Sequence, residues 1–362
     1  MKDSKKYVLV IISCMFIFLL FHLSIWLIFT SKIFGLDKDY YSGDLARISY
    51  TFDILKTRQL QYTLKKKHLA KDNYLGQHID LLTLGDSFSN GIANGQNPYY
   101  QDFLATKYNV NVLNISMDDN LNFLNTIIGL YNNGTLAKIQ PKAILIETIQ
   151  REVIRLNLNS INFNYTITPV GIKHLVAPRL KTSPIPNLFP INEINYKVPF
   201  YSFYSSMKKH KIHNAYKFYL KEKLFNNNKK NKLIVYKNDI ENIPQFTQGN
   251  ILLLNKNLNK LAKILNKSNI ILIYMPAADK YDLYYPYIKN KIYPKSNFFK
   301  ILRSLNKNYI FIDTQKILRR QLQNNVSDIF YEDDTHWSYK ASDAVTNAQV
   351  FKDIFSGRLN AL

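Results

Sequence analysis

Two short stretches, far apart in the chain, hold the residue types of a nucleophile, a base and an acid. Gly-Asp-Ser-Phe-Ser-Asn-Gly occupies residues 85–91, and Asp-Asp-Thr-His-Trp occupies residues 333–337. A serine hydroxyl becomes nucleophilic when a histidine takes its proton and a carboxylate orients that histidine. The two stretches could therefore supply one catalytic group if the fold brings them together.

Ser87 is the nucleophile that the first stretch predicts. It follows an apolar run at residues 78–85 that is typical of a buried strand. The chain has only 11 glycines, yet Gly85 and Gly91 flank this serine. A sharp strand-to-helix turn needs glycine where the backbone is crowded or φ is positive, and it can expose a serine hydroxyl. The alternative is an ordinary turn in which Asp86 or Ser87 caps a helix.

His336 is the base that the second stretch predicts. Among the seven histidines, it alone has a carboxylate within three residues on its N-terminal side, in a loop after the last predicted core strand. Asp334 and Asp333 are both candidates, because a reach of two or three residues can bring a carboxylate to Nδ1. Trp337 either shields the imidazole from water or is a core aromatic residue.

Strands and helices alternate around these stretches. This alternation predicts a three-layer α/β domain with a mostly parallel, five-stranded sheet. Functional groups gather at the carboxyl ends of strands in such sheets, which is where Ser87 lies. Strands are expected at residues 78–85, 109–116, 141–148, 269–276 and 309–313, and helices at 97–108, 120–133, 250–266, 298–305, 315–323 and 339–356.

Two regions depart from the alternation. Residues 45–75 are interpreted as a helical stalk. Residues 156–248 are rich in proline, tyrosine and basic residues, and they are interpreted as an inserted cap that is part helical and part irregular. The expected organisation is a cytoplasmic tip and anchor at 1–30, a juxtamembrane stalk at 31–76, and a catalytic domain at 77–362 with the insertion.

The N-terminal segment is long and apolar enough to cross a membrane. The run from Tyr7 to Phe29 would be about 35 Å long as a helix, enough to span a hydrocarbon core of about 30 Å. An uncleaved anchor is favoured over a signal peptide, because the run is long and lacks an evident cleavage site. Lysines before the run place the N-terminus in the cytoplasm and the body in the periplasm of a bacterium. His22 is interpreted as a tolerated polar residue within the anchor.

The composition excludes several classes of site and of binding partner. The only cysteine, Cys14, lies in the apolar run, which excludes a disulfide framework or a cysteine-based metal site in the exported part. The formal charge of +22 comes from lysines scattered among asparagines. We therefore expect no nucleic-acid partner and favour anionic headgroups or an anionic polysaccharide as the attracted surface.

The two stretches together resemble the SGNH hydrolase superfamily. They are most similar to the branch that contains the alginate O-acetyltransferase proteins and their exopolysaccharide relatives, for which Asp-Thr-His-Trp is characteristic. Residues 147–151 resemble that branch's Glu-x-x-x-Arg segment, and residues 275–285 its Pro-x-x-x-Lys stretch. The resemblance covers residues 77–355 without 156–248. In the alginate proteins the Asp-His motif precedes the serine, whereas here it follows, as in ordinary SGNH enzymes.

The resemblance implies roles for individual residues. Ser87 is then the nucleophile, His336 the base and Asp334 its orienting acid. Relatives with Asp-x-x-His would use Asp333 instead of Asp334.

The oxyanion hole departs from the superfamily's pattern. The usual glycine after the second strand is replaced by an aspartate at 118 or 119, and Asp119 would contribute a backbone N–H. The usual third-block asparagine is absent, so Gln150 or Arg151 would donate in its place.

The implied activity is passage of an acyl group, usually acetyl, through an acyl-serine to a hydroxyl of an envelope or exported polysaccharide. Such proteins often work beside a multi-span membrane O-acyltransferase in the inner membrane, and no cofactor or metal is implied. Two alternatives stay open. One is an esterase or deacetylase that acts on a glycan, and the other is a non-catalytic polysaccharide-binding or assembly subunit.

Overall fold

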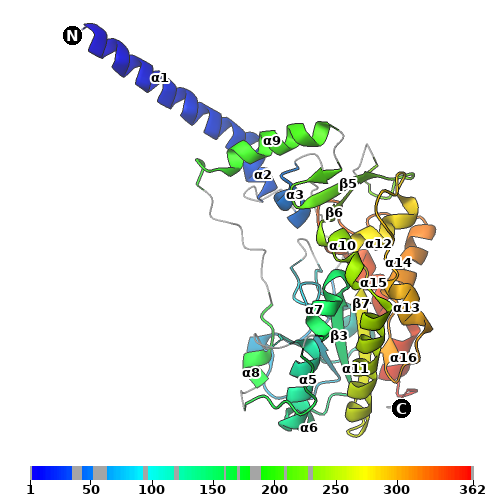
Figure 1. Cartoon of the computed structure of the whole chain (residues 1–362). Coiled ribbons are helices and arrows are strands. Elements are labelled where there is room, and N and C mark those ends of the chain that lie inside the picture. The colour runs from blue at the N-terminus through cyan, green and yellow to red at the C-terminus, as the bar shows by residue number, and fades with distance from the viewer. Residues whose placement is uncertain are drawn as a thin grey trace.

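A parallel five-stranded sheet forms the centre of the molecule (Figure 1). The structure is a computed structural model of the 362-residue chain, and it describes residues 2–34, 43–51, 63–92, 97–117, 122–158, 160–168, 172–179, 189–207, 210–226 and 231–359. The strand order is β2-β1-β3-β7-β8, and the neighbours in it pair in parallel, which confirms the predicted α/β class. The strands are β1 (Leu81–Leu84), β2 (Val112–Ile115), β3 (Ala143–Ile149), β7 (Ile271–Ala277) and β8 (Ile310–Phe311).

Helices cover both faces of the sheet, which explains why its strands are continuous apolar runs. Side chains of β1 and β3 alternate between two hydrophobic clusters, one on each face. One cluster includes α4 (Tyr100–Tyr108), α14 (Thr314–Gln323), α15 (Tyr339–Thr346) and α16 (Gln349–Phe355). The other includes α5 (Phe123–Asn132), α6 (Thr135–Ile139), α7 (Val153–Leu158), α11 (Gln248–Asn266) and α13 (Phe298–Ser304).

The strand order reverses between β1 and β3, which makes the carboxyl ends of these two strands a topological switch point. The chain moves from β1 outward to β2, and it then returns past β1 to β3 and continues to β7 and β8. Ligands of open parallel sheets bind where the order reverses in this way, because the two connections leave the sheet in opposite directions. The serine turn after β1 and residues 150–151 after β3 therefore flank the same switch point.

The inserted region contains a second sheet that the sequence did not predict. The antiparallel strands β4 (Lys211–Ile212), β5 (Ala215–Tyr219) and β6 (Lys232–Tyr236) lie in a segment expected to be helical or irregular. Short strands in a lysine- and asparagine-rich segment give a weak periodic pattern, so this expectation missed them. The region also holds α8 (Ile172–Leu175), α9 (Ile194–Ser206), α10 (Asn238–Glu241) and η4 (Ile243–Gln245).

The helical stalk expected at 45–75 is only partly helical. The helix α3 (Asp44–Ser49) is short, and residues 52–62 lie outside the described residues. Leu69 is extended instead, and it forms a parallel bridge with Leu113 at the edge of the sheet. The expected final helix at 339–356 is interrupted between α15 and α16. The remaining short elements are η2 (Lys71–Asn73), η3 (Gln150–Glu152), α12 (Lys280–Tyr284) and η5 (Tyr285–Tyr287).

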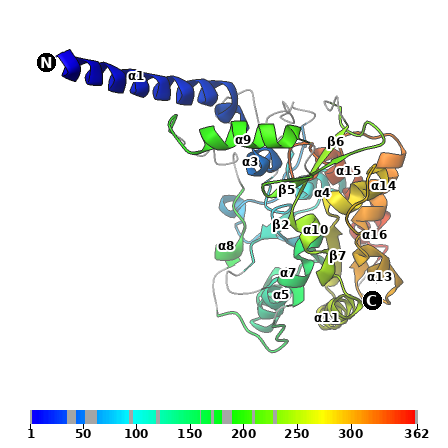
Figure 2. The same ribbon diagram turned by 45° about the horizontal axis from the view of Figure 1, so that its top comes forward.

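A long apolar helix projects from the rest of the molecule (Figures 1 and 2). The helix α1 (Lys2–Ile25) continues through a π-helical turn, η1 (Trp26–Thr30), into α2 (Ser31–Ile33). Residues 4–33 are long and apolar enough to cross a membrane, and the side chains of residues 4–21 are exposed. The segment is compatible with a transmembrane span or a signal sequence.

Candidate active site

The serine turn begins directly after β1. Gly85 is required there, because a Cβ would lie 2.1 Å from Ser89 Oγ and 2.5 Å from Glu147 Oε2. Gly91 at the end of the turn has a φ of +69°, which favours glycine. The two glycines let the chain turn closely against β3 and leave Ser87 half-buried at the switch point.

The Asp86 carboxylate braces this turn against β3. Its Oδ1 accepts the N–H of Phe88 at 3.1 Å, and its Oδ2 accepts the N–H of Ile149, the last residue of β3, at 2.6 Å. Burial raises the pKa of Asp86, although these hydrogen bonds oppose the shift. Beneath the turn, Ser89 Oγ donates to Glu147 Oε2 at 2.9 Å. These bonds fix the backbone on either side of the serine.

The histidine loop is closed at its base. Phe330 and Trp337 form an antiparallel bridge, and the N–H of Ser338 donates to the carbonyl of Ile329 at 2.8 Å. Residues 331–336 therefore form a tight loop that projects from the end of the bridge. The loop presents His336 toward the serine turn.

Lys280 holds this loop from within. Its Nζ donates to the backbone carbonyls of Tyr331 at 2.8 Å, Glu332 at 2.8 Å and Asp334 at 3.0 Å. An ammonium group has three donors, so these bonds use all of them. Burial lowers the pKa of Lys280 to about 8, although the neighbouring carboxylates oppose the shift. The Pro-x-x-x-Lys segment singled out from the sequence thus contains the residue that shapes the histidine loop.

The structure brings Ser87, His336 and Asp334 into one hydrogen-bonded chain. His336 Nε2 lies 2.7 Å from Ser87 Oγ, and His336 Nδ1 lies 2.6 Å from Asp334 Oδ1. The same carboxylate oxygen accepts the backbone N–H of His336 at 3.0 Å, which fixes the side chain of Asp334 against the loop. A serine, an imidazole and a carboxylate in this order have the geometry of a catalytic triad.

The charges around His336 favour its protonated form. The ring is buried, which opposes a positive charge, but the Asp334 carboxylate outweighs burial and raises the pKa of His336 above its ordinary value. An imidazole that takes a proton from serine becomes an imidazolium, so the same carboxylate would stabilise that product.

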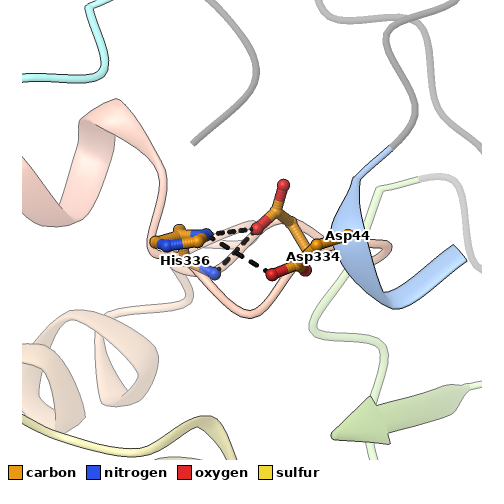
Figure 3. A group of neighbouring side chains, drawn as sticks. All are labelled: Asp44, Asp334 and His336. Atoms are coloured by element: carbon orange, nitrogen blue, oxygen red, sulfur yellow. Dashed lines mark hydrogen bonds and ion pairs between the residues drawn. The ribbon is translucent and has the colours of Figure 1, made fainter. Parts of the chain in front are cut away.

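A second carboxylate comes from the N-terminal segment (Figure 3). Asp44, the first residue of α3, accepts the N–H of Thr335 at 2.7 Å and also the Thr335 hydroxyl. Its Oδ2 lies 3.8 Å from His336 Nδ1. Burial and the charge of Asp334 together raise the pKa of Asp44 to about 6.

Asp333, the alternative orienting acid that the sequence offered, binds a different partner. Its Oδ2 accepts the N–H of Gly43 at 2.9 Å, and its carbonyl accepts the N–H of Ala46 at 3.2 Å. A Cβ on Gly43 would lie 2.0 Å from that carbonyl oxygen, so the contact requires glycine. Asp333 therefore fastens residues 43–46 to the loop, and Asp334 is the aspartate at Nδ1.

An aromatic group covers one side of the imidazole, but it is not Trp337. The ring centroid of Phe88 lies 4.8 Å from that of His336. Trp337 is buried and packs edge-on against Phe88, with centroids 4.9 Å apart. The structure therefore supports the interpretation of Trp337 as a core aromatic residue, which packs against Phe88 next to Ser87.

Asp119 and Gln150 were two of the expected oxyanion donors. Asp119 lies outside the described residues. Gln150 is fully buried, and its side-chain amide donates to Asp282 at 3.1 Å and to Ser296 at 2.8 Å, so both side-chain N–H groups already have acceptors. The interpretation of Gln150 as an oxyanion donor is therefore not supported by its geometry.

Arg151 acts on the histidine of the triad through its charge. Its Nη1 donates to Asp239 at 3.1 Å and to Asp279 at 3.4 Å. Its positive charge acts on His336 and lowers the pKa of that ring, against the effect of Asp334. Arg151 thus remains a candidate for contact with a negatively charged reacting group.

A metal ion is a possible alternative occupant of this carboxylate–histidine group. One ligand atom each from Asp44, Asp334 and His336 lies within 4.8 Å of the others. However, two ligands of a tetrahedral zinc ion at about 2.1 Å would lie about 3.4 Å apart. The 2.6 Å between His336 Nδ1 and Asp334 Oδ1 is a hydrogen-bond length. The side chains as they lie fit a triad better than a metal site.

Two residues of the site were not found by sequence reasoning. Asp44 carried no motif, and the role of Lys280 was not foreseen. Comparison of the chain with protein-family models, with curated proteins and with solved structures finds no match. The assignment of a function to this site therefore depends on the geometry of the side chains described above.

Proposed function

We propose that the chain is an SGNH-type serine O-acyltransferase, anchored in the bacterial inner membrane by α1 with its α/β domain in the periplasm. It passes an acyl group, most simply acetyl, to a hydroxyl of an envelope or exported polysaccharide. The observation that carries the proposal is the chain of hydrogen bonds from Asp334 through His336 to Ser87 at the strand switch point.

The triad geometry assigns a role to each group. Ser87 Oγ attacks the carbonyl carbon of the acyl donor while His336 Nε2 takes the hydroxyl proton. The tetrahedral oxyanion collapses, the donor's leaving group departs with that proton, and an acyl-serine remains. A sugar hydroxyl then attacks the acyl carbon and gives its proton to His336 Nε2, and Ser87 is released as the free alcohol. Asp334 holds the imidazole in the tautomer that both proton transfers need.

The position of the loop supports acyl supply from a membrane partner. Asp333 binds the N–H of Gly43, which is ten residues after Ile33, the end of the apolar helix. Ten residues span at most about 35 Å. The catalytic loop is therefore close to the membrane end of the anchor, where a multi-span O-acyltransferase could present the donor.

The test uses the full chain in lipid nanodiscs with p-nitrophenyl acetate as the donor. We expect an initial burst of nitrophenol, because acylation of Ser87 precedes its slower discharge. We expect Ser87→Ala to abolish the burst and Ser268→Ala, an exposed serine, to leave it unchanged. An acceptor oligosaccharide should then divert acetyl from acetate to sugar ester.

The outcomes separate the alternatives. Acetate release that is indifferent to the acceptor would identify a hydrolase. Equal behaviour of the wild type and Ser87→Ala would remove both enzymatic functions and leave a polysaccharide-binding or assembly role. A chelator that abolishes the burst would indicate a metal at Asp44, Asp334 and His336 instead of a triad.

A further inference from the structure

Exposed apolar side chains gather on one face of α9. Phe200 is 61% exposed, Phe203 is 67% exposed and Met207, which follows the helix, is 55% exposed. With Tyr196 they are spaced at i, i+4, i+7 and i+11, which places them along one stripe of a helix. We call these four residues the α9 stripe. Large exposed apolar groups arranged in this way are typical of an interaction surface.

The α9 stripe begins at a contact with the apolar N-terminal helix. Tyr196 stacks on Phe21, with ring centroids 5.3 Å apart, and its hydroxyl lies 3.0 Å from His22 Nε2. Asn195 Nδ2 lies 2.9 Å from His22 Nδ1, and Asn195 Oδ1 accepts the Thr30 hydroxyl at 2.8 Å. His22 is thus buried and hydrogen-bonded, which explains how a histidine fits within an apolar segment.

The contact also gives the depth of α9. An apolar helix that enters the hydrocarbon at Tyr7 needs about 20 residues to cross it, which brings it out near Trp26. His22 lies four residues earlier, which is about 6 Å inside that boundary at 1.5 Å per residue. Helices that lie in the interface bury their apolar face about 5–10 Å deep. The α9 stripe therefore starts at the depth of an interfacial helix.

The opposite face of α9 holds the rest of the molecule. Val198 is buried, and Tyr201 stacks on Tyr50 with centroids 5.4 Å apart. Lys217 of β5 donates to the carbonyl of Ser205 and to its hydroxyl. The helix lies across the end of α1 in both views and links it to the small sheet (Figures 1 and 2).

We propose that α9 is a second membrane contact, an interfacial helix whose stripe inserts into the outer face of the same bilayer that α1 crosses. The proposal rests on the anchoring part of the proposed function. Its occupant is lipid, because the stripe is continuous with the contact to α1 and has aromatic residues at the depth where they favour the interface. Two contacts would fix the orientation of the domain, so the serine turn would face one way relative to the membrane.

Site-specific fluorescent labels on single cysteines test this placement. In Cys14→Ser background, Phe203→Cys and Met207→Cys report the stripe, and Leu253→Cys on α11, 45% exposed, is the matched apolar control. Each full chain is placed in nanodiscs of phosphatidylcholine and phosphatidylglycerol and labelled with bimane. Quenching is measured with acrylamide in water and with lipids that carry a doxyl group high on the acyl chain.

We expect the doxyl lipids to quench both stripe labels more strongly than the Leu253→Cys label. We expect acrylamide to quench the stripe labels less strongly than that control. Acrylamide quenching of the stripe labels equal to that of the control overturns the proposal. If acrylamide quenching of the stripe labels equals that of the control in nanodiscs but is reduced in native membranes, a protein partner covers the stripe, and the proposal is also overturned. A label on the native Cys14 is read in parallel. If water reaches that label, the anchor itself is refuted, and the docking of α9 with it.

Discussion

Replacement of Asp44 by asparagine tests whether the N-terminal segment takes part in the chemistry. Asp44 Oδ2 lies 3.8 Å from His336 Nδ1, and the Asp44 side chain is 27% exposed. At that distance two unit charges attract by about 4 kcal/mol at an effective dielectric constant of 20, and by about 1 kcal/mol in bulk water. A partly exposed pair lies between these limits. We take about 1.4 kcal/mol, which corresponds to one pKa unit or a tenfold change in rate.

The expected result has two parts. Because the Asp44 anion supports the imidazolium, its loss should slow acylation of Ser87 about tenfold. It should also lower the pKa of His336 by about one unit. His336 must be neutral to accept a proton, so activity rises with pH through its pKa, and the rise should move to lower pH in the variant. The wild-type rise also includes ionisation of Asp44 near pH 6, and in Asp44→Asn that component should disappear.

The assay is the pH dependence of kcat/KM for nitrophenyl acetate, from pH 4 to 9, with the full chain in nanodiscs. Asp72→Asn, an exposed carboxylate in η2, is the control and should match the wild type. Asp44→Glu keeps the charge and should restore part of the pH profile. If Asp44→Asn slows the reaction but leaves the position and steepness of the pH profile unchanged, Asp44 only supports the loop and the electrostatic reasoning is wrong.

Three further substitutions test other parts of the site. Asp334→Asn should lower the rate of acylation by up to ~10⁴-fold. Asp333→Asn should have a mild effect, because an amide oxygen can still accept the N–H of Gly43. Equal effects of the two variants on the stopped-flow burst would contradict the assignment of Asp334. Lys280→Met leaves three buried carbonyls without their donor and should lower the free energy of unfolding by about 3 kcal/mol, as measured by urea denaturation. Gly85→Ala forces a Cβ against Ser89 and should destabilise the domain by about 1–3 kcal/mol, and an unchanged melting temperature would show that the turn can relax.

The central sheet could be predicted because its strands are buried on both faces. Residues 81–84, 143–149 and 271–277 are mostly apolar runs bounded by turn residues, and these runs predict strands without any knowledge of their pairing partners. The three-stranded sheet of the insertion could not be predicted. Its strands are as short as two residues and gain their stability from pairing and from contacts with distant elements.

The candidate site was partly predictable for the same kind of reason. The serine and histidine stretches are local patterns, so residue types and spacing identified Ser87, His336 and two aspartates. The choice between those aspartates depends on loop geometry that Lys280 and Gly43 impose through tertiary contacts. Asp44 reaches Thr335 across 291 positions of sequence, and nothing in its own neighbourhood signals that contact. Gln150 shows the opposite case, because its position after the third strand suggested a donor, whereas its amide N–H groups are bonded to Asp282 and Ser296.

The order of the site residues along the chain has a consequence for biogenesis. Asp44 and Ser87 lie near the N-terminus, whereas His336 and the loop that carries it lie within the last 30 residues or so of the chain. In a chain whose anchor keeps the N-terminus in the cytoplasm, the residues after the anchor cross in chain order, so Asp44 and Ser87 emerge early and His336 emerges late. Under the proposed function, Ser87 therefore has no base until residues 331–336 have also crossed the membrane and packed against the serine turn. Completion of the proposed triad would thus be the last step of export.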